Sequence, residues 1–408
     1  MRLSVLVCIF ASACTGIIDV DTAPPPPKTD VQIVIRDGQS PQPGVAVIFQ
    51  GVDGSLVAEA TTDATGAATA ELPEGGSVTV IRSYPTPTGG DPLPIEVYTY
   101  AGVKSGDRLA LGRPASEQGT ASAVLVKVPT TAGGTVKIQS PCGGGQGTGP
   151  LVAITVRDCA PEIGLYVVDG AQQSFFKRTT FSENMDVSNE SLVGALASPI
   201  SATNVPPNTV VTVEQRLGYD GFYFFSTGAK RVDTTPANTN VPPLSGVEQL
   251  VITSSSSNNR TQVVASRGAY NQDSLIVDAS AGLIASVSGL SYKPTGITWV
   301  EEGGGTADAV IASLDVTRAD LVNNNRQYVR MIIAPHTGAS LQVPVLPGTG
   351  AIYNPKMGDQ VATSLGIVAA TGGYDAVRAR AFAVPSVVDA TPLDGRITLS
   401  YAGSAPGI

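Results

Sequence analysis

The chain has 408 residues and a formal net charge of −9, with 25 Lys and Arg against 34 Asp and Glu. The 45 Gly and 30 Pro make up about 18% of the chain, against roughly 12% on average. The 42% of hydrophobic residues exclude a disordered chain, and the acidic balance excludes nucleic-acid binding through counterion release. We therefore expect a folded protein of several domains that binds no nucleic acid.

The first residues have the pattern of an export signal. One positive charge at Arg2 precedes an apolar run from Leu3 to Ala13, which is shorter than the roughly 20 residues that a membrane-spanning helix needs. The sequence Ala11-Ser12-Ala13-Cys14 resembles a bacterial lipobox, in which the cysteine is lipidated and becomes the new N-terminus. The resemblance implies a signal peptide over 1–13 and a lipid on Cys14; the alternative is an ordinary secretory signal cleaved after Ala13.

Residues 14–29 have the composition of a tether. Four consecutive prolines, Pro24 to Pro27, favour an extended, semi-rigid segment. A stiff spacer between a lipid-bearing Cys14 and the first folded domain suits a protein held at a surface. We therefore expect an exported protein that is attached to the bacterial outer membrane or cell surface and contacts the membrane through its lipid anchor.

Residues 30–113 alternate apolar and polar side chains with a period of two, as in Val31, Ile33 and Ile35, which predicts short strands. Turn motifs separate them, in the order Asp37-Gly38, Pro43-Gly44-Val45-Ala46-Val47, Thr62-Asp63-Ala64-Thr65-Gly66 and Leu72-Pro73-Glu74-Gly75. This order resembles the carboxypeptidase regulatory-like (transthyretin-like) domain, a small antiparallel β-sandwich. The resemblance implies an accessory module without active-site residues.

Residues 114–229 continue this pattern and predict an Ig-like β-sandwich. Expected strands include 135–140 and 151–157, and the glycine-rich run Gly143–Gly149 between them is predicted to be a flexible hairpin loop. The Pro-Cys-Gly sequence before this loop and the cysteine after the next strand are similar to segments of the multidomain lipoproteins of myxobacteria. Most of those proteins have no assigned function.

Residues 230–408 predict one larger β-sandwich. Its expected strands include 309–316 and 328–333, and Val343–Pro347 is predicted as an edge strand because proline cannot donate to a β-ladder. The predicted fold class is therefore all-β, built of tandem antiparallel β-sandwiches of transthyretin-like and Ig-like type, with very little helix.

The four cysteines predict one disulfide. Cys8 lies in the signal's apolar run and Cys14 is the expected lipid site, which leaves Cys142 and Cys159. Export places the chain in an oxidising compartment, where disulfides persist. The two residues flank a hairpin whose ends would lie one strand length apart. The bridge therefore requires either that the glycine-rich loop folds Cys142 back along its partner strand or that Cys159 turns back toward Cys142. Two cysteines without a nearby histidine cannot complete a zinc site.

Residues typical of enzymes and metal sites are scarce. His336 is the only histidine, which excludes every two-histidine motif, and no G-x-S-x-G nucleophile motif occurs. We expect His336 to be a loop residue. Acidic turns such as Asp37-Gly38 and Asp53-Gly54 lack the density of a calcium loop, although calcium binding there stays open. The sequence predicts no catalytic residue, no metal site and no cofactor.

One aromatic cluster stands out in a chain of only 5% aromatic residues; it comprises Tyr219, Phe222, Tyr223, Phe224 and Phe225. On a strand, Phe222 and Phe224 would face one way and Tyr223 and Phe225 the other. One face is expected in a sandwich core and the other at a domain junction, or alternatively in a stacking platform for a glycan or protein partner. The predicted function is a non-catalytic cell-envelope lipoprotein for adhesion, scaffolding or binding, and the alternative is a carbohydrate-binding accessory protein of an exported hydrolase system.

Overall fold

The structure is a computed structural model. It describes residues 30–37, 40–83, 95–113, 121–131, 134–140, 142–157, 162–194, 196–204, 210–219, 222–232, 237–241, 248–257, 260–269, 276–318, 326–382, 387–392 and 394–402. The expected signal peptide and tether therefore lie outside the described residues.

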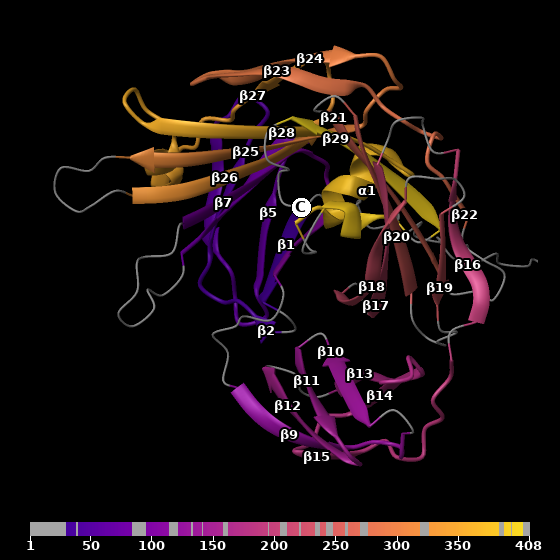
Figure 1. Ribbon diagram of the computed structural model, residues 1–408. Coiled ribbons are helices and arrows are strands. Elements are labelled where there is room, and N and C mark those ends of the chain that lie inside the picture. The colour runs from indigo at the N-terminus through magenta and orange to yellow at the C-terminus, as the bar shows by residue number, and fades with distance from the viewer. Residues whose placement is uncertain are drawn as a thin grey trace, which may run out of the picture.

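Most of the described chain is β-strand, arranged in several sheets (Figure 1). Its helical elements are one α-helix, α1 (Gly373–Arg380), and two 3-10 turns, η1 (Gly348–Tyr353) and η2 (Val387–Ala390). The all-β sandwich architecture with very little helix is confirmed.

Twelve strands form the largest sheet, which we call the central sheet. Their order is β18 (Phe222–Val232), β17 (Val210–Tyr219), β20 (Glu248–Ser257), β21 (Arg260–Ala269), β29 (Gly395–Ala402), β28 (Gln360–Ala370), β25 (Ala309–Arg318), β26 (Arg326–Pro335), β7 (Ile95–Val103), β6 (Gly76–Arg82), β3 (Ala46–Gln50) and β4 (Leu56–Thr61). Strand β7 pairs in parallel with β26, from Ile95 opposite Tyr328 to Tyr100 opposite Ile333. Strands from the predicted 30–113 and 230–408 units thus share one sheet; the domain boundaries themselves stay a prediction.

Three smaller sheets surround the central sheet. The N-terminal sheet contains β2 (Ser40–Pro41), β1 (Asp30–Asp37), β5 (Ala67–Glu71) and β8 (Arg108–Arg113). The cover sheet, drawn at the top of Figure 1, contains β23 (Ser286–Lys293), β24 (Gly296–Glu302) and β27 (Ser340–Gln342). A third sheet contains β19 (Ala237–Val241), β16 (Leu196–Thr203) and β22 (Ile276–Asp278).

The middle of the central sheet is covered on both faces. In β25, Ala309 and Ile311 pack into the core shared with the N-terminal sheet, whereas Val310 and Ala312 pack into the core beneath the cover sheet. All four side chains are at most 2% exposed. A strand buried on both faces needs a nearly continuous apolar run, as this one has, instead of the alternation of a one-sided strand.

Alternation is retained where a strand buries one face. In β1, Val31, Ile33 and Ile35 are fully buried, and they pack into the same core as Phe382, which follows α1. The ring of Phe382 lies 5.0 Å from that of Tyr100 in an edge-on arrangement, the geometry that aromatic quadrupoles favour. A single core therefore joins the N-terminal strands to α1.

Residues 121–194 form a separate seven-stranded sheet, which we call the glycine module; Figure 1 shows it at the bottom. Its strand order is β14 (Ser174–Thr180), β13 (Glu162–Asp169), β10 (Thr135–Ser140), β11 (Gly143–Thr148), β12 (Leu151–Arg157), β9 (Ala121–Lys127) and β15 (Asn184–Asp186). Alternate residues of its strands, such as Val152, Ile154 and Val156, are buried in one apolar cluster.

Two sequence expectations about loops and edges were wrong. The glycine-rich run does not form a flexible hairpin loop: its first six residues are β11, a strand paired to β10 on one side and β12 on the other. Likewise, Val343–Pro347 forms no strand, since β27 ends at Gln342. Two prolines within five residues remove two ladder donors, which explains why pairing stops there.

Candidate functional site

The structure describes one of the three cysteines that the sequence predicts as site residues. Cys14 lies outside the described residues, and so does Cys159. Cys142 is described, and its carbonyl oxygen accepts a hydrogen bond of 2.9 Å from the backbone N–H of Arg157. Because β11 is a strand, the chain runs back along β12, so Cys142 and the end of β12 are neighbours. The Cys142–Cys159 pairing stays a prediction.

The aromatic cluster lies on the β17–β18 hairpin. Tyr219 pairs with Phe222 and Gly218 with Tyr223, but Leu217 pairs with Phe225, so Phe224 is the extra residue of a β-bulge. The uninterrupted alternation that the sequence indicates is therefore broken at Phe224. The side chains of the cluster lie outside the described part of the structure. Strand β18 contacts β10 of the glycine module, below the hairpin in Figure 1.

Strand β11 fits only glycine at its closest contacts. A Cβ on Gly144 would lie 2.5 Å from the carbonyl oxygen of Ile138, and one on Gly145 would lie 2.5 Å from that of Ala153. Neither distance is possible for a real Cβ. The run of glycines therefore lets three backbones approach closely, and it leaves the outer surface of β11 without bulky side chains.

A shallow depression of about 420 Å³ lies over this strand. Lys137 pairs with Gln146, and Gln139 pairs with Gly144, so these four residues share the outward face of the sheet. They line the depression together with Ser140. An ammonium group, two amides and open backbone can donate and accept hydrogen bonds, which suits a polar ligand that lies flat on the sheet.

A second cluster joins the only histidine and the only tryptophan of the chain. His336 Nε2 lies 2.7 Å from Glu301 Oε1, and Trp299 Nε1 donates to that same oxygen at 2.6 Å. Trp299 is 5% exposed, because it sits in the core beneath the cover sheet. His336 follows the last residue of β26, so its predicted loop position is confirmed, but its partner Glu301 was not predicted. The only available signal was that Trp299 and Glu301 are two residues apart on one strand.

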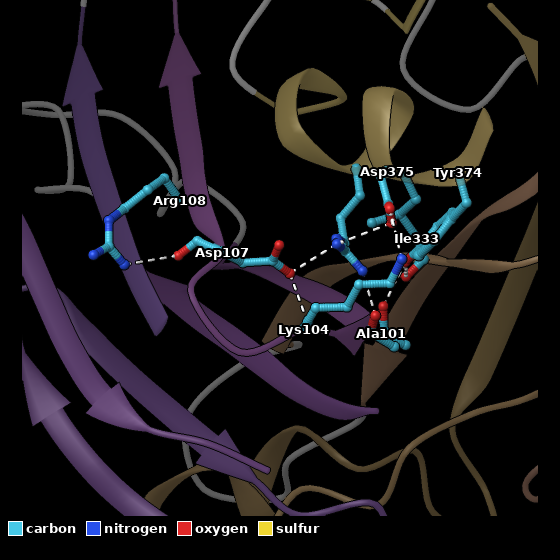
Figure 2. A network of polar contacts seen from close by, with 9 residues as sticks. Ala101, Lys104, Asp107, Arg108, Ile333, Tyr374 and Asp375 are labelled. Atoms are coloured by element: carbon cyan, nitrogen blue, oxygen red, sulfur yellow. Dashed lines mark hydrogen bonds and ion pairs between the residues drawn. The ribbon is translucent and has the colours of Figure 1, made fainter. Parts of the chain in front are cut away.

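A third cluster, drawn in Figure 2, fastens α1 to the turn between β7 and β8. Arg378 is 2% exposed and lies 2.8 Å from Asp107 and 3.1 Å from Asp375. Lys104 Nζ donates to Asp375 Oδ2 at 2.6 Å, and this hydrogen bond holds the pKa of Asp375 below its usual range. Each charge in the cluster has an opposite charge beside it, so the arrangement suits a structural clamp.

The buried phenol beside this clamp is also engaged. Tyr374 Oη donates to the carbonyl oxygen of Ala101 at 2.5 Å, and burial raises its pKa well above the usual range. The Arg378 guanidinium lies 5.1 Å from the Tyr374 ring centroid. A phenol that keeps its proton and binds a carbonyl is a positioning group for α1.

The described residues contain no group of three or more His, Cys, Asp or Glu side chains arranged to hold a metal ion. Nor do they include a helix with the length and apolar character that crossing a bilayer requires.

Comparison with known proteins assigns no family. No protein-family model matches the chain, and no curated protein matches it. A solved structure, the native conformation of E. coli alpha-2-macroglobulin, matches with 9% identity and a TM-score of 0.12. The match covers 81% of this chain and 26% of that one, so the chain spans about a quarter of its length. A TM-score of this size carries no argument, and function has to be inferred from the residues of this chain.

Proposed function

We propose that the protein is a non-catalytic, exported lipoprotein of the bacterial cell envelope that binds an envelope ligand or protein partner through the outer face of β10 and β11. The observation that carries the proposal is the depression over the glycine strand, with its polar rim of Lys137, Gln139 and Gln146. The glycines that let β10 and β12 approach β11 closely also leave the outer face of the strand with few side chains, so a ligand can approach the backbone there.

Attachment through Cys14 rests on the sequence. The lipobox-like Ala11-Ser12-Ala13-Cys14 and the proline spacer after it suit a folded body held a short distance from a lipid surface. The resemblance of residues 31–82 to a carboxypeptidase regulatory-like domain also fits an accessory role. Metabolic labelling with a palmitate analogue is expected to mark the wild type and to leave the Cys14→Ser variant unmarked; equal labelling of both would overturn the anchor.

A Cys142–Cys159 disulfide would stabilise the same surface. Cys142 directly precedes β11, and its carbonyl bonds to Arg157 at the end of β12, two residues before Cys159. A bridge there would fix the first residue of the glycine strand against its neighbour and stabilise the fold by roughly 3 kcal/mol. Non-reducing peptide mapping of the exported protein is expected to recover both cysteines in one linked peptide, and two alkylatable thiols would contradict the bridge.

The alternative function is carbohydrate binding by an accessory protein of an exported hydrolase system. The observation in its favour is the position of the aromatic cluster on a hairpin whose second strand contacts the glycine module. Aromatic rings are the usual platforms for sugar rings. The two proposals therefore differ in which residues hold the ligand.

Retention of the purified protein on peptidoglycan sacculi and on outer-membrane vesicles tests both. Lys137→Ala and Gln146→Ala are expected to reduce retention, since each removes one polar group from the rim. Arg178→Ala is the matched control, because Arg178 is exposed in the same module and pairs with Glu162 instead. Retention that is lost in Phe224→Ala but kept in Lys137→Ala would establish the alternative. Equal retention of all variants would exclude both surfaces.

A further inference from the structure

Arg330 is a fully buried arginine in the middle of the central sheet. It lies on β26 opposite Leu314 of β25, on the face that packs beneath the cover sheet. Its Nη2 donates to the carbonyl oxygen of Pro344. Its Nε and Nη1 have no hydrogen-bond partner in the described part of the chain. Buried polar groups are nearly always paired, so two unpaired N–H groups on one cation require an explanation.

No carboxylate among the described residues pairs with this charge. Asp359, whose charge acts on Tyr292, is paired with another arginine: its two oxygens accept from Arg318 Nε at 2.8 Å and from Arg318 Nη2 at 2.6 Å. Burial lowers the pKa of Arg330 to about 10, so the guanidinium remains charged at neutral pH. An uncompensated buried cation costs several kcal/mol of desolvation.

Two hydroxyl groups lie unpaired in the same layer. Tyr292 of β23 belongs to the cover sheet, and its buried hydroxyl has no partner among the described residues. Its pKa is raised by burial and lowered by the charge of Arg330, so the two groups are within electrostatic reach. The hydroxyl of Thr363 is likewise buried and unpaired. Thr363 lies opposite Leu314 on the side away from Arg330, so the three residues form one row across the sheet.

We propose that Arg330, together with the Tyr292 hydroxyl, binds one small monovalent anion between the central sheet and the cover sheet. The charge of such an anion would balance the guanidinium, and its lone pairs would accept from Nε–H, Nη1–H and the phenol. The surrounding side chains are apolar and tightly buried, so a halide fits this layer better than a large oxyanion. The anion would fasten the cover sheet to the central sheet.

Thermal unfolding in chloride tests the site. Chloride is titrated against gluconate at constant ionic strength, with the whole chain. Because ligand binding to the folded state stabilises it, the wild-type Tm is expected to rise with the logarithm of the chloride concentration, by about 3–5 °C when chloride is about 100-fold above Kd. Arg330→Met is expected to fold, since an apolar replacement of a buried ion is often tolerated, and to lose the chloride response. Arg108→Met is the matched control, because this arginine is 43% exposed and pairs with Asp30, and it is expected to respond as the wild type does.

A direct measurement separates binding from stability. The ³⁵Cl NMR line is expected to broaden with the wild type and with Arg108→Met, and to remain narrow with Arg330→Met. Tyr292→Phe removes one donor only. It is therefore expected to fold and to bind chloride with a Kd that is several-fold higher than that of the wild type. A wild-type Tm that does not respond to chloride, together with a line width as narrow as that with Arg330→Met, would overturn the proposal. This test is independent of ligand binding at β11.

Discussion

Arg378 of α1 and Asp107 of the β7–β8 turn form an ion pair of 2.8 Å in which the guanidinium is 2% exposed and the carboxylate 19%. The pair joins parts of the chain that are far apart in sequence. We predict that Arg378→Ala lowers the free energy of unfolding by about 2–3 kcal/mol, toward the low end for a broken buried pair because water reaches the carboxylate left behind. Urea denaturation measures this loss.

The control for this prediction is Lys104→Ala. Lys104 pairs with Asp375, but its side chain is 49% exposed, and exposed pairs contribute about 0–1 kcal/mol. A loss in Lys104→Ala equal to that in Arg378→Ala would show that the buried position of Arg378 has no special importance.

Four turns in the described part of the chain share one hydrogen-bond pattern, which makes the free energy of unfolding depend on pH in the acid range. In each, an aspartate Oδ1 accepts from the backbone N–H and the hydroxyl of the residue two positions later; the pairs are Asp53 with Ser55, Asp63 with Thr65, Asp186 with Ser188 and Asp278 with Ser280. The bond from the Ser188 hydroxyl is the main cause that lowers the pKa of Asp186 from 3.8 to about 2. Because the folded-state pKa is the lower one, the stabilisation is complete above pH 3.8 and is lost as the pH falls toward 2.

We therefore predict that Asp186→Asn reduces the acid-dependent loss of stability. The urea midpoint of the wild type is expected to fall between about pH 4 and pH 2, and that of the variant to fall less. Asp315→Asn is the control, since Asp315 is an exposed residue in the middle of β25 outside these turns. An identical pH profile for wild type and Asp186→Asn would contradict the role of the turn.

The shared oxygen of Glu301 makes the single tryptophan a reporter of the single histidine. Trp299 and His336 both bond to Glu301 Oε1, and their ring centroids are 6.4 Å apart. We predict that His336→Gln changes the tryptophan emission, because the variant replaces the ring that lies 6.4 Å from the indole and shares its carboxylate acceptor. A fluorescence spectrum of the folded variant that is identical to that of the wild type would contradict this contact.

Close backbone contacts make the glycine strand intolerant of any side chain. We predict that Gly145→Ala destabilises the glycine module by about 1–3 kcal/mol, as overpacking does, because its Cβ would lie 2.5 Å from a backbone oxygen. Gly194→Ala is the control, since a Cβ there meets nothing within 4 Å and is expected to change stability by less than about 0.5 kcal/mol. Hydrogen exchange of amides in β10 and β12 measures the local effect.

Strands with alternating burial could be predicted from the sequence, because apolar side chains mark the buried positions and polar side chains mark the exposed ones. Val31, Ile33 and Ile35 are an example. The glycine strand could not be predicted, because glycine has no side chain to alternate and its pairing depends on the strands on either side. Helix α1 was also not predicted. It buries Arg378, and this burial depends on pairing with Asp107, which is distant in sequence.

The same distinction between local patterns and long-range contacts applies to the candidate sites. The sequence identified Cys142 and the aromatic hairpin by residue type, but the bulge at Phe224 depends on pairing that composition does not encode. The depression at β11, the Glu301 cluster and the buried Arg330 arise from contacts between strands that are remote in the chain. Such contacts leave no local pattern in the sequence.

The position of β29 has a consequence for biogenesis. This strand, the last one described, does not lie at an edge of the central sheet but between β21 and β28. A chain emerging from a ribosome or a translocation channel therefore leaves two open strand edges until residue 402 has appeared, and such edges invite aggregation. The central sheet therefore cannot be completed before residue 402 has appeared, and a chain truncated before β29 is expected to depend on chaperones for solubility.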